Sequence, residues 1–160
     1  MQQWSERPNT IHWPPILYGL ALLLPWLLAW VVPLPFPDLS EIVDALLPPV
    51  GWALVATGVT VGWLAIRSFA GAGTPFDPTA RAETLVTFGL YNRTRNPMYL
   101  AALIAFFGLA LATDNLWRLI AVPLLFVGLE YLAVVREEAH LAARFGDSWR
   151  EYAGRVSRWW

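Results

Sequence analysis

The sequence predicts an all-α integral membrane protein with about four transmembrane helices and an amphipathic C-terminal helix. Its 160 residues are 57% hydrophobic and only 14% charged, whereas soluble domains are about 45–50% apolar and about 25% charged. The few charges are also clustered, which leaves long apolar segments between them. The length suits one domain over residues 1–160.

The apolar segments define the expected spans, because a transmembrane helix needs roughly 20 predominantly apolar residues. Three of the segments contain no Asp, Glu, Lys or Arg, and the fourth contains only Glu130. We therefore expect transmembrane helices near residues 14–33, 47–68, 97–113 and 116–136.

The distribution of arginine predicts how these helices are oriented. The loop after the first span carries Asp38, Glu41 and Asp44 and no basic residue, whereas ten of the eleven arginines lie toward the chain ends or between the second and third spans. Cytoplasmic loops are enriched in basic residues. We therefore expect both chain ends and residues 68–96 to face the cytoplasm, with the 34–46 loop in the periplasm.

The segments outside the spans have their own signals. Residues 71–80 contain two glycines and two prolines, which favours an ordered loop or turn. Apolar residues recur at helical spacing over 136–153, which predicts an amphipathic helix near the cytoplasmic interface. Gly146 is a candidate break in that helix. Trp159 and Trp160 are expected at the level of the lipid headgroups.

Composition also excludes several classes of site. The chain contains no cysteine, so disulfides, cysteine-ligated metals and thiol nucleophiles are excluded. With two histidines, His12 and His140, we expect no metal site. Glu137 and His140 form an E-x-x-H pair, but di-iron bundles need that pair twice. No run of basic residues suggests a nucleic-acid partner.

Residues 89–100, GLYNRTRNPMYL, place polar groups where the third span begins. Pro97 suits the first turn of a helix and Asn96 the N-cap position before it. The free N–H groups and positive dipole end of that helix attract a carboxylate or a phosphate. The alternative is an ordinary capped helix, flanked by arginines that contact lipid phosphates.

Two further clusters follow the fourth span. Glu137 and Glu138 lie about 100° apart on a helix, so one could bind a ligand ammonium or ribose hydroxyls while the other pairs with an arginine. The alternative is solvated charge at the interface. In residues 145–160, Arg155 and Arg158 stand beside aromatic residues, and we expect Arg158 to anchor lipid phosphates.

Taken together, three blocks resemble the isoprenylcysteine carboxyl methyltransferase family, which belongs with the membrane phospholipid methyltransferases. The blocks are AGAGTPFDP, LVTFGLYNRTRNPMYL and REEAHLAARFGDSWREYAGRVSRW. The resemblance covers about residues 52–160. It includes an R-[HN]-P-x-Y motif at Arg95–Tyr99, an adjacent pair of glutamates, and an F-G-x-x-[YW]-x-x-Y-x-x-R-V motif that begins at Phe145.

The resemblance implies an S-adenosylmethionine-dependent methyltransferase in a bacterial-type inner membrane, with its active site at the cytoplasmic face. The residues that it implies for the cofactor are Gly89, Tyr91, Asn96, Pro97, Tyr99, Glu137 and Glu138. It further implies that Arg95 and Arg155 flank the reacting group of the acceptor. Asn96 replaces the histidine of eukaryotic members, and the chain has fewer spans than they do, so the acceptor is open.

The expected acceptor is lipophilic, and isoprenylcysteine-type carboxyl methylation is the first hypothesis. A carboxylate is already ionised at pH 7 and needs no base, but it needs a bidentate arginine to hold it. An amine would have to lose a proton. The alternatives are N-methylation of a phospholipid or small amine, thiol methylation, and a non-methyltransferase relative such as a reductase.

Glu130 is expected in the substrate cavity, because an ionisable group at membrane depth usually faces a cavity or a partner. It lies seven residues before Glu137 and so on nearly the same face of a regular helix, about 10 Å away. We expect Glu130 at the membrane-embedded end of the cavity that Glu137 faces, where it could pair with an amine acceptor. The alternative is a structural glutamate packed against Tyr18 or the backbone of the third span.

Overall fold

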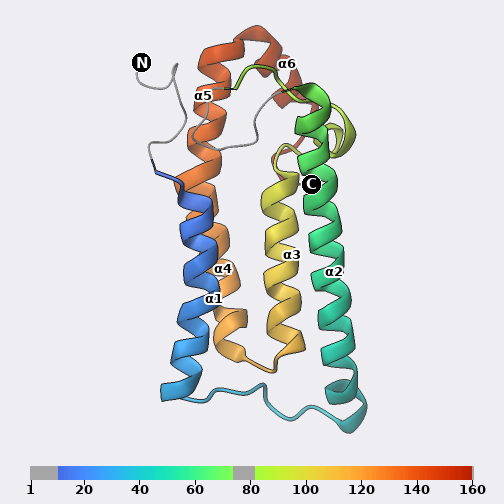
Figure 1. The fold of residues 1–160 in the computed structure, drawn as a ribbon, viewed down its shortest axis with the longest axis vertical. Coiled ribbons are helices and arrows are strands. Elements are labelled where there is room, and N and C mark those ends of the chain that lie inside the picture. Colours follow the sequence, from blue (N-terminus) through green and yellow to red (C-terminus); the bar gives the residue numbers. More distant parts are fainter. Residues whose placement is uncertain (1–10, 74–81, 160) are drawn as a thin grey trace.

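The computed structural model describes residues 11–73 and 82–159 and contains only helices and loops in these ranges (Figure 1). The elements are α1 (Trp13–Val31), α2 (Glu41–Ala72), the 3₁₀ turn η2 (Gly89–Asn92), α3 (Pro97–Ala112), α4 (Leu116–Leu129), the π-helical turn η3 (Glu130–Val134), α5 (Val135–Phe145) and α6 (Asp147–Arg155). The expected all-α class is confirmed. Most of the expected 71–80 loop, and Trp160, lie outside the described residues.

Helices α1 to α4 run alternately up and down as a bundle, in which α1 packs on α4 and α2 on α3 (Figure 1). Helix α1 begins with Pro14 and Pro15 in its first turn, where proline costs no hydrogen bond. Its Leu17 side chain lies against Gly128 of α4, where an added Cβ would come within 3.1 Å. Helices α1 and α3 agree with the expected spans to within two residues at each end.

Helix α2 is longer than the expected 47–68 span. It begins at Glu41, because the Ser40 side chain caps it by accepting a hydrogen bond from Val43 N at 3.4 Å. Glu41 and Asp44 therefore lie in its first turn, where acidic residues are favoured by the helix dipole, rather than in a loop. The helix ends at Gly73, whose φ of +63° is the left-handed conformation typical of a C-terminal glycine.

The contact between α2 and α3 depends on glycine. A Cβ at Gly58 would lie 2.6 Å from Ala101 O, and one at Gly51 would lie 2.6 Å from Gly108 O. A Cβ at Gly108 would in turn lie 2.6 Å from Gly51 O. Small residues allow helix backbones to approach in this way in membranes, where burial from water does not drive association.

The helix that contains the expected fourth span continues beyond residue 136. Helix α4 continues through η3 into α5, so that one helical rod extends from Leu116 to Phe145. The π turn inserts one extra residue into the helix and so rotates everything after it relative to a regular α-helix. The rod breaks at Gly146, which has a φ of +55°, and α6 then folds back, which confirms Gly146 as the break.

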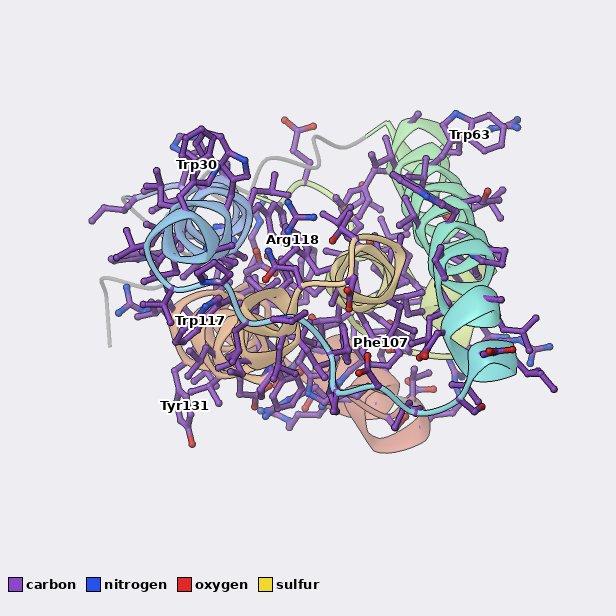
Figure 2. All side chains as sticks on the ribbon, turned by 90° about the horizontal axis from the view of Figure 1, so that it is seen from below. Trp30, Trp63, Phe107, Trp117, Arg118 and Tyr131 are labelled. Atoms are coloured by element: carbon purple, nitrogen blue, oxygen red, sulfur yellow. The ribbon has the colours of Figure 1, made fainter. Side chains whose placement is uncertain are left out.

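The outer surface of the bundle is apolar. Trp30, Trp63 and Tyr131 point away from the helices (Figure 2) and are 76%, 54% and 66% exposed. Among the residues that the structure describes, three helices are long and apolar enough to cross a membrane, and α3 is a shorter apolar helix of 16 residues. An apolar surface of this extent is suited to lipid, so this is an all-α membrane protein.

Candidate functional site

A cavity of about 510 Å³, here called the inner cavity, lies at the end of the bundle that carries α5 and α6. This volume is in the range of small-molecule and cofactor sites. Five segments converge on it: the start of α1, the end of α2, residues 82–99, α5 and α6. The polar and aromatic side chains that line it are His12, Tyr18, Phe69, Thr84, Tyr91, Arg95, Asn96, Tyr99, Glu137, Glu138, His140, Trp149 and Tyr152.

Glu137 is held toward the inner cavity by Tyr99. The Tyr99 hydroxyl donates to Glu137 Oε1 at 2.6 Å, from the first turn of α3 to the first turn of α5. Tyr99 is buried, and its ring packs in the core between α1, α3 and α4. Within the described residues Glu137 Oε2 accepts no hydrogen bond, so it can accept one from a ligand in the cavity.

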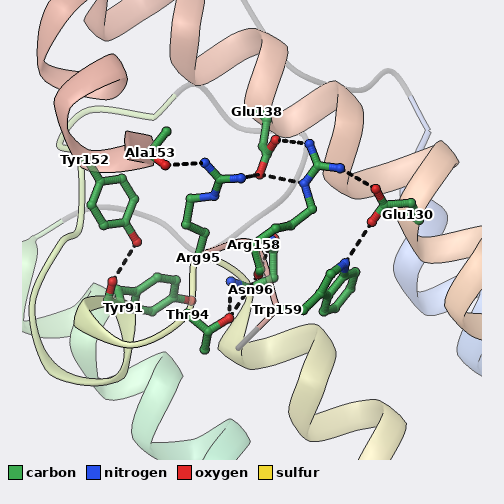
Figure 3. Close-up of polar contacts among 10 residues, drawn as sticks. All are labelled: Tyr91, Thr94, Arg95, Asn96, Glu130, Glu138, Tyr152, Ala153, Arg158 and Trp159. Atoms are coloured by element: carbon green, nitrogen blue, oxygen red, sulfur yellow. Dashed lines mark hydrogen bonds and ion pairs between the residues drawn. The ribbon is translucent and has the colours of Figure 1, made fainter. Parts of the chain in front are cut away.

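Glu138 points to a different set of partners. Arg158 Nε and Nη2 donate to its two carboxylate oxygens at 3.1 and 2.5 Å (Figure 3). Arg95 Nη2 lies 3.1 Å from Oε1 of the same carboxylate. Arg158 Nη1 also pairs with Glu130, whose other oxygen accepts a hydrogen bond from Trp159 Nε1 at 3.1 Å. Two arginines and two glutamates thus form a line of alternating charge.

The C-terminal segment is fastened to the turn before α3. Arg95 N donates to Ser157 O at 3.0 Å, and the side chains of Thr94 and Asn96 both donate to Arg158 O, at 3.0 and 3.1 Å (Figure 3). Asn96 occupies the N-cap position of α3 as expected, but its side chain makes no capping hydrogen bond. The Asn96 side-chain amide instead donates to Arg158 O in the C-terminal segment.

Tyr91 and Tyr152 close the side of the inner cavity next to α6. The Tyr152 hydroxyl donates to Tyr91 O at 2.7 Å. Burial raises the pKa of Tyr152 to about 12, against the lowering effect of Arg95 and Arg155, so the hydroxyl keeps its proton and remains a donor at neutral pH. The Tyr91 ring packs edge-on against Phe69, with centroids 5.3 Å apart.

Gly89 and Pro97 shape the backbone beside the cavity and do not line it. Gly89 has a φ of +64°, and a Cβ there would lie 2.9 Å from the Ser68 hydroxyl. Pro97 is fully buried at the first position of α3. Both residues therefore fix the course of the chain between Tyr91 and Tyr99.

A second cavity of about 490 Å³, here called the lateral cavity, lies beside α4 and the C-terminal segment. It is lined by Arg95, Phe126, Val127, Glu130, Tyr131, Arg158 and Trp159. Arg95 is shared by both cavities. Val127 and Tyr131 are at least half exposed on the apolar outer surface, so this cavity opens toward lipid.

Glu130 lines the lateral cavity and not the inner one, which corrects the expectation that it shares a cavity with Glu137. The π turn is the reason, since its extra residue rotates Glu137 by about 100° away from the face of Glu130. Glu130 also contacts neither Tyr18 nor α3 through a hydrogen bond; its described partners are Arg158 and Trp159.

The structure brings Tyr91, Arg95, Asn96, Tyr99, Glu137 and Glu138 together around the inner cavity. It leaves Arg155 exposed at the end of α6, outside both cavities. Sequence reasoning missed Arg158, which it assigned to lipid phosphate. The eight-residue spacing of Glu130 and Glu138 could have indicated that one arginine binds both. That spacing brings the two side chains onto one face only when the helix contains a π turn.

A family model described as phospholipid methyltransferase matches residues 48–148, which include the turn before α3, Glu137 and Glu138. The chain is also 35% identical over 76 residues to the nickel-cobalt-cadmium resistance protein NccN of Alcaligenes xylosoxydans xylosoxydans. That match covers 48% of the chain and 35% of the relative, so the chain spans about a third of that protein's length. No solved structure matches.

The described part of the chain contains no candidate metal site. Over residues 11–73 and 82–159, no group of three or more His, Asp or Glu side chains lies close enough together to hold a metal ion.

Proposed function

Since the chain belongs to the phospholipid methyltransferase family, we propose that it is a membrane enzyme that transfers a methyl group from S-adenosylmethionine to a lipophilic acceptor. The observation that supports this most directly is the inner cavity, in which the family-like motifs of α3 and α5 meet. We assign the donor to the inner cavity and the acceptor to the wall formed by Arg95.

The residues of the inner cavity fit S-adenosylmethionine, which supplies an activated methyl group on a sulfonium centre. Glu137 Oε2 offers a counter-charge for its ammonium or an acceptor for its ribose hydroxyls. The first N–H groups of α3, at Met98 and Tyr99, have no partner within their helix and suit its carboxylate. The rings of Phe69 and Trp149 offer apolar walls for the adenine.

Arg95 supports a carboxylate as the reacting group of the acceptor, with isoprenylcysteine-type carboxyl methylation as the first candidate. Its guanidinium lies between the two cavities, and its Nε is buried without a hydrogen-bond partner. A buried donor of this kind favours an anionic ligand, and guanidinium holds a carboxylate in defined geometry. An ionised carboxylate needs no base, so the protein has only to align it with the methyl group.

N-methylation of a phospholipid or small amine is the second candidate. An amine acceptor would need a group to take its proton, and Glu130 is the acid in the lateral cavity. Both of its oxygens are engaged by Arg158 and Trp159, which favours the carboxylate acceptor over the amine.

We also propose that the end of the bundle with the inner cavity faces the cytoplasm. The end of α2, the turn before α3, and α5 lie at that end (Figure 1), and these segments carry Arg67, Arg93, Arg95, Arg136 and Arg144. The opposite end carries Asp38, Glu41 and Asp44, with Arg118 as its arginine. The positive-inside rule assigns the arginine-rich end to the cytoplasm.

The decisive experiment combines donor binding with acceptor screening. Purified protein in lipid nanodiscs is titrated calorimetrically with S-adenosylmethionine, and then incubated with radiolabelled donor and a panel of prenylcysteines, phospholipids and amines. We expect donor binding that weakens at least tenfold in Glu137→Ala, equivalent to about 1.4 kcal/mol, and labelling of a prenylcysteine. The control is Glu151→Ala, an exposed acid on α6.

Two results would contradict the proposal. Unchanged donor affinity in Glu137→Ala would reject the assigned donor site. Binding of a nicotinamide cofactor in place of S-adenosylmethionine would instead support a reductase-like relative. Labelling of amines alone would leave the donor site in place and replace the carboxyl acceptor by the second candidate.

A further inference from the structure

We infer that Arg158 is a positioning residue for the proposed methyl transfer, because it holds Glu138 and thereby keeps Arg95 available at the wall between the two cavities. The inference rests on the proposed function and adds a residue to which that function assigned no role. Its starting point is that Arg158 makes more contacts with the Glu138 carboxylate than Arg95 does.

Arg158 occupies most of the Glu138 carboxylate. It donates to both oxygens, through Nε and Nη2, whereas Arg95 reaches only Oε1 and only through Nη2. A carboxylate that is free to pair with one arginine prefers two parallel hydrogen bonds. Arg158 already makes that bidentate contact, so Glu138 cannot offer it to Arg95.

Arg95 consequently keeps a hydrogen-bond donor that the protein does not use. Its Nη1 donates to Ala153 O at 3.2 Å, its guanidinium lies 5.5 Å from the centre of the Trp149 ring, and its buried Nε has no partner. Without Arg158, Glu138 would present both oxygens to Arg95 and draw its guanidinium into a closed pair. The N–H groups of Arg95 would then bind Glu138 and could not bind the methyl acceptor.

The fold explains how one arginine can restrain Glu138 so firmly. Glu130 and Glu138 are eight residues apart, which would separate them by about 80° on a regular α-helix. The π turn between them reduces that angle to about 20° on the same arithmetic, so both carboxylates reach the guanidinium of Arg158 (Figure 3). The Arg158 carbonyl is fixed separately by Thr94 and Asn96.

The test is a rescue experiment on the full chain in nanodiscs. Arg158→Gln should lower kcat/KM for the acceptor at least tenfold while the affinity for S-adenosylmethionine changes less than twofold. Adding Glu138→Gln should recover at least fivefold of that loss, because the neutral side chain no longer captures Arg95. Arg150→Gln is the matched control, since Arg150 is an exposed arginine on α6 whose partner is Asp147 at the surface.

Each outcome bears on the inference. Wild-type activity in Arg158→Gln would overturn it, and so would a loss that Glu138→Gln deepens, because an arginine that merely anchors the tail predicts no rescue. If Arg158→Gln does not fold, Arg158→Lys replaces it, with partial loss and the same rescue expected. Failure of the wild-type protein to transfer methyl groups would refute the proposed function itself, and is seen before any variant is made.

Discussion

At the scale of single residues, the adjacent glutamates of α5 have separate partners. Glu137 is bound by Tyr99 and faces the inner cavity, whereas Glu138 is bound by two arginines. Neighbouring side chains on a helix diverge by about 100°, so two acids that both line the inner cavity bind different partners. Under the proposed function, the pair connects the donor site at Glu137 with the wall at Arg95, where the acceptor is expected.

Lysine substitutions of Arg95 and Arg155, the two arginines that the family resemblance implies for the acceptor, should differ in their effect on turnover. Arg95→Lys should lower turnover at least tenfold with donor affinity nearly unchanged, because lysine cannot copy the planar fork of guanidinium. Arg155→Lys should change turnover less than threefold, because Arg155 is exposed and lines neither cavity. Steady-state kinetics with calorimetry measures both. A larger effect at Arg155 would contradict this prediction and support the acceptor-flanking role that the family resemblance implies.

At the scale of elements, the π turn sets the direction of every side chain that follows it. Deleting Leu132 should convert η3 to a regular α-helix and rotate α5 by about 100°. We expect this deletion to abolish donor binding while Leu132→Ala, which keeps the residue count, binds normally. Calorimetry on both proteins, after circular dichroism has established equal helix content, tests this. Normal binding by the deletion variant would contradict it.

The glycines between α2 and α3 give a second prediction at this scale. Gly58→Ala should destabilise the bundle, because its Cβ would lie 2.6 Å from a backbone oxygen and neither helix can yield locally. Gly19→Ala is the control, since nothing lies within 4 Å of a Cβ there and alanine is the better helix former. Thermal unfolding in detergent should show a lower Tm for Gly58→Ala alone.

The sequence predicts the elements well where a single physical cause acts. Charge-free runs predicted the positions of helices α1 to α4, although α2 is longer than expected. The candidate break at Gly146 is confirmed, with a φ of +55° at that residue. The π turn was not predictable, because no local pattern in residues 130–134 distinguishes it from an α-helix, and its stabilising contacts to Arg158 and Trp159 come from 28 residues away or more. This turn explains why the sequence predicted the wrong cavity for Glu130. It also explains why the contacts of Arg158 with Glu130 and Glu138 were not predicted.

At the scale of the whole molecule, the two ends of the bundle differ in charge, and this predicts its orientation. Because the chain contains no cysteine, Ser40→Cys and Ser157→Cys each introduce a unique thiol, one at each end. A membrane-impermeant maleimide added to intact cells should label Cys at position 40 and spare position 157 until the cells are lysed. The reverse pattern would invert the proposed topology.

The unequal lengths of α2 and α3 have a consequence for the membrane around them. At about 1.5 Å per residue, the 32 residues of α2 extend about 48 Å and the 16 residues of α3 about 24 Å, whereas the hydrocarbon core is about 30 Å thick. Such hydrophobic mismatch is relieved by tilting the long helix and thinning the bilayer beside the short one. The inner cavity lies beside the first turn of α3, so thinned lipid would bring acyl chains and headgroups closer to the proposed donor and acceptor sites. The acyl-chain length of the host lipid should therefore change the rate of the proposed methyl transfer independently of how much acceptor is present.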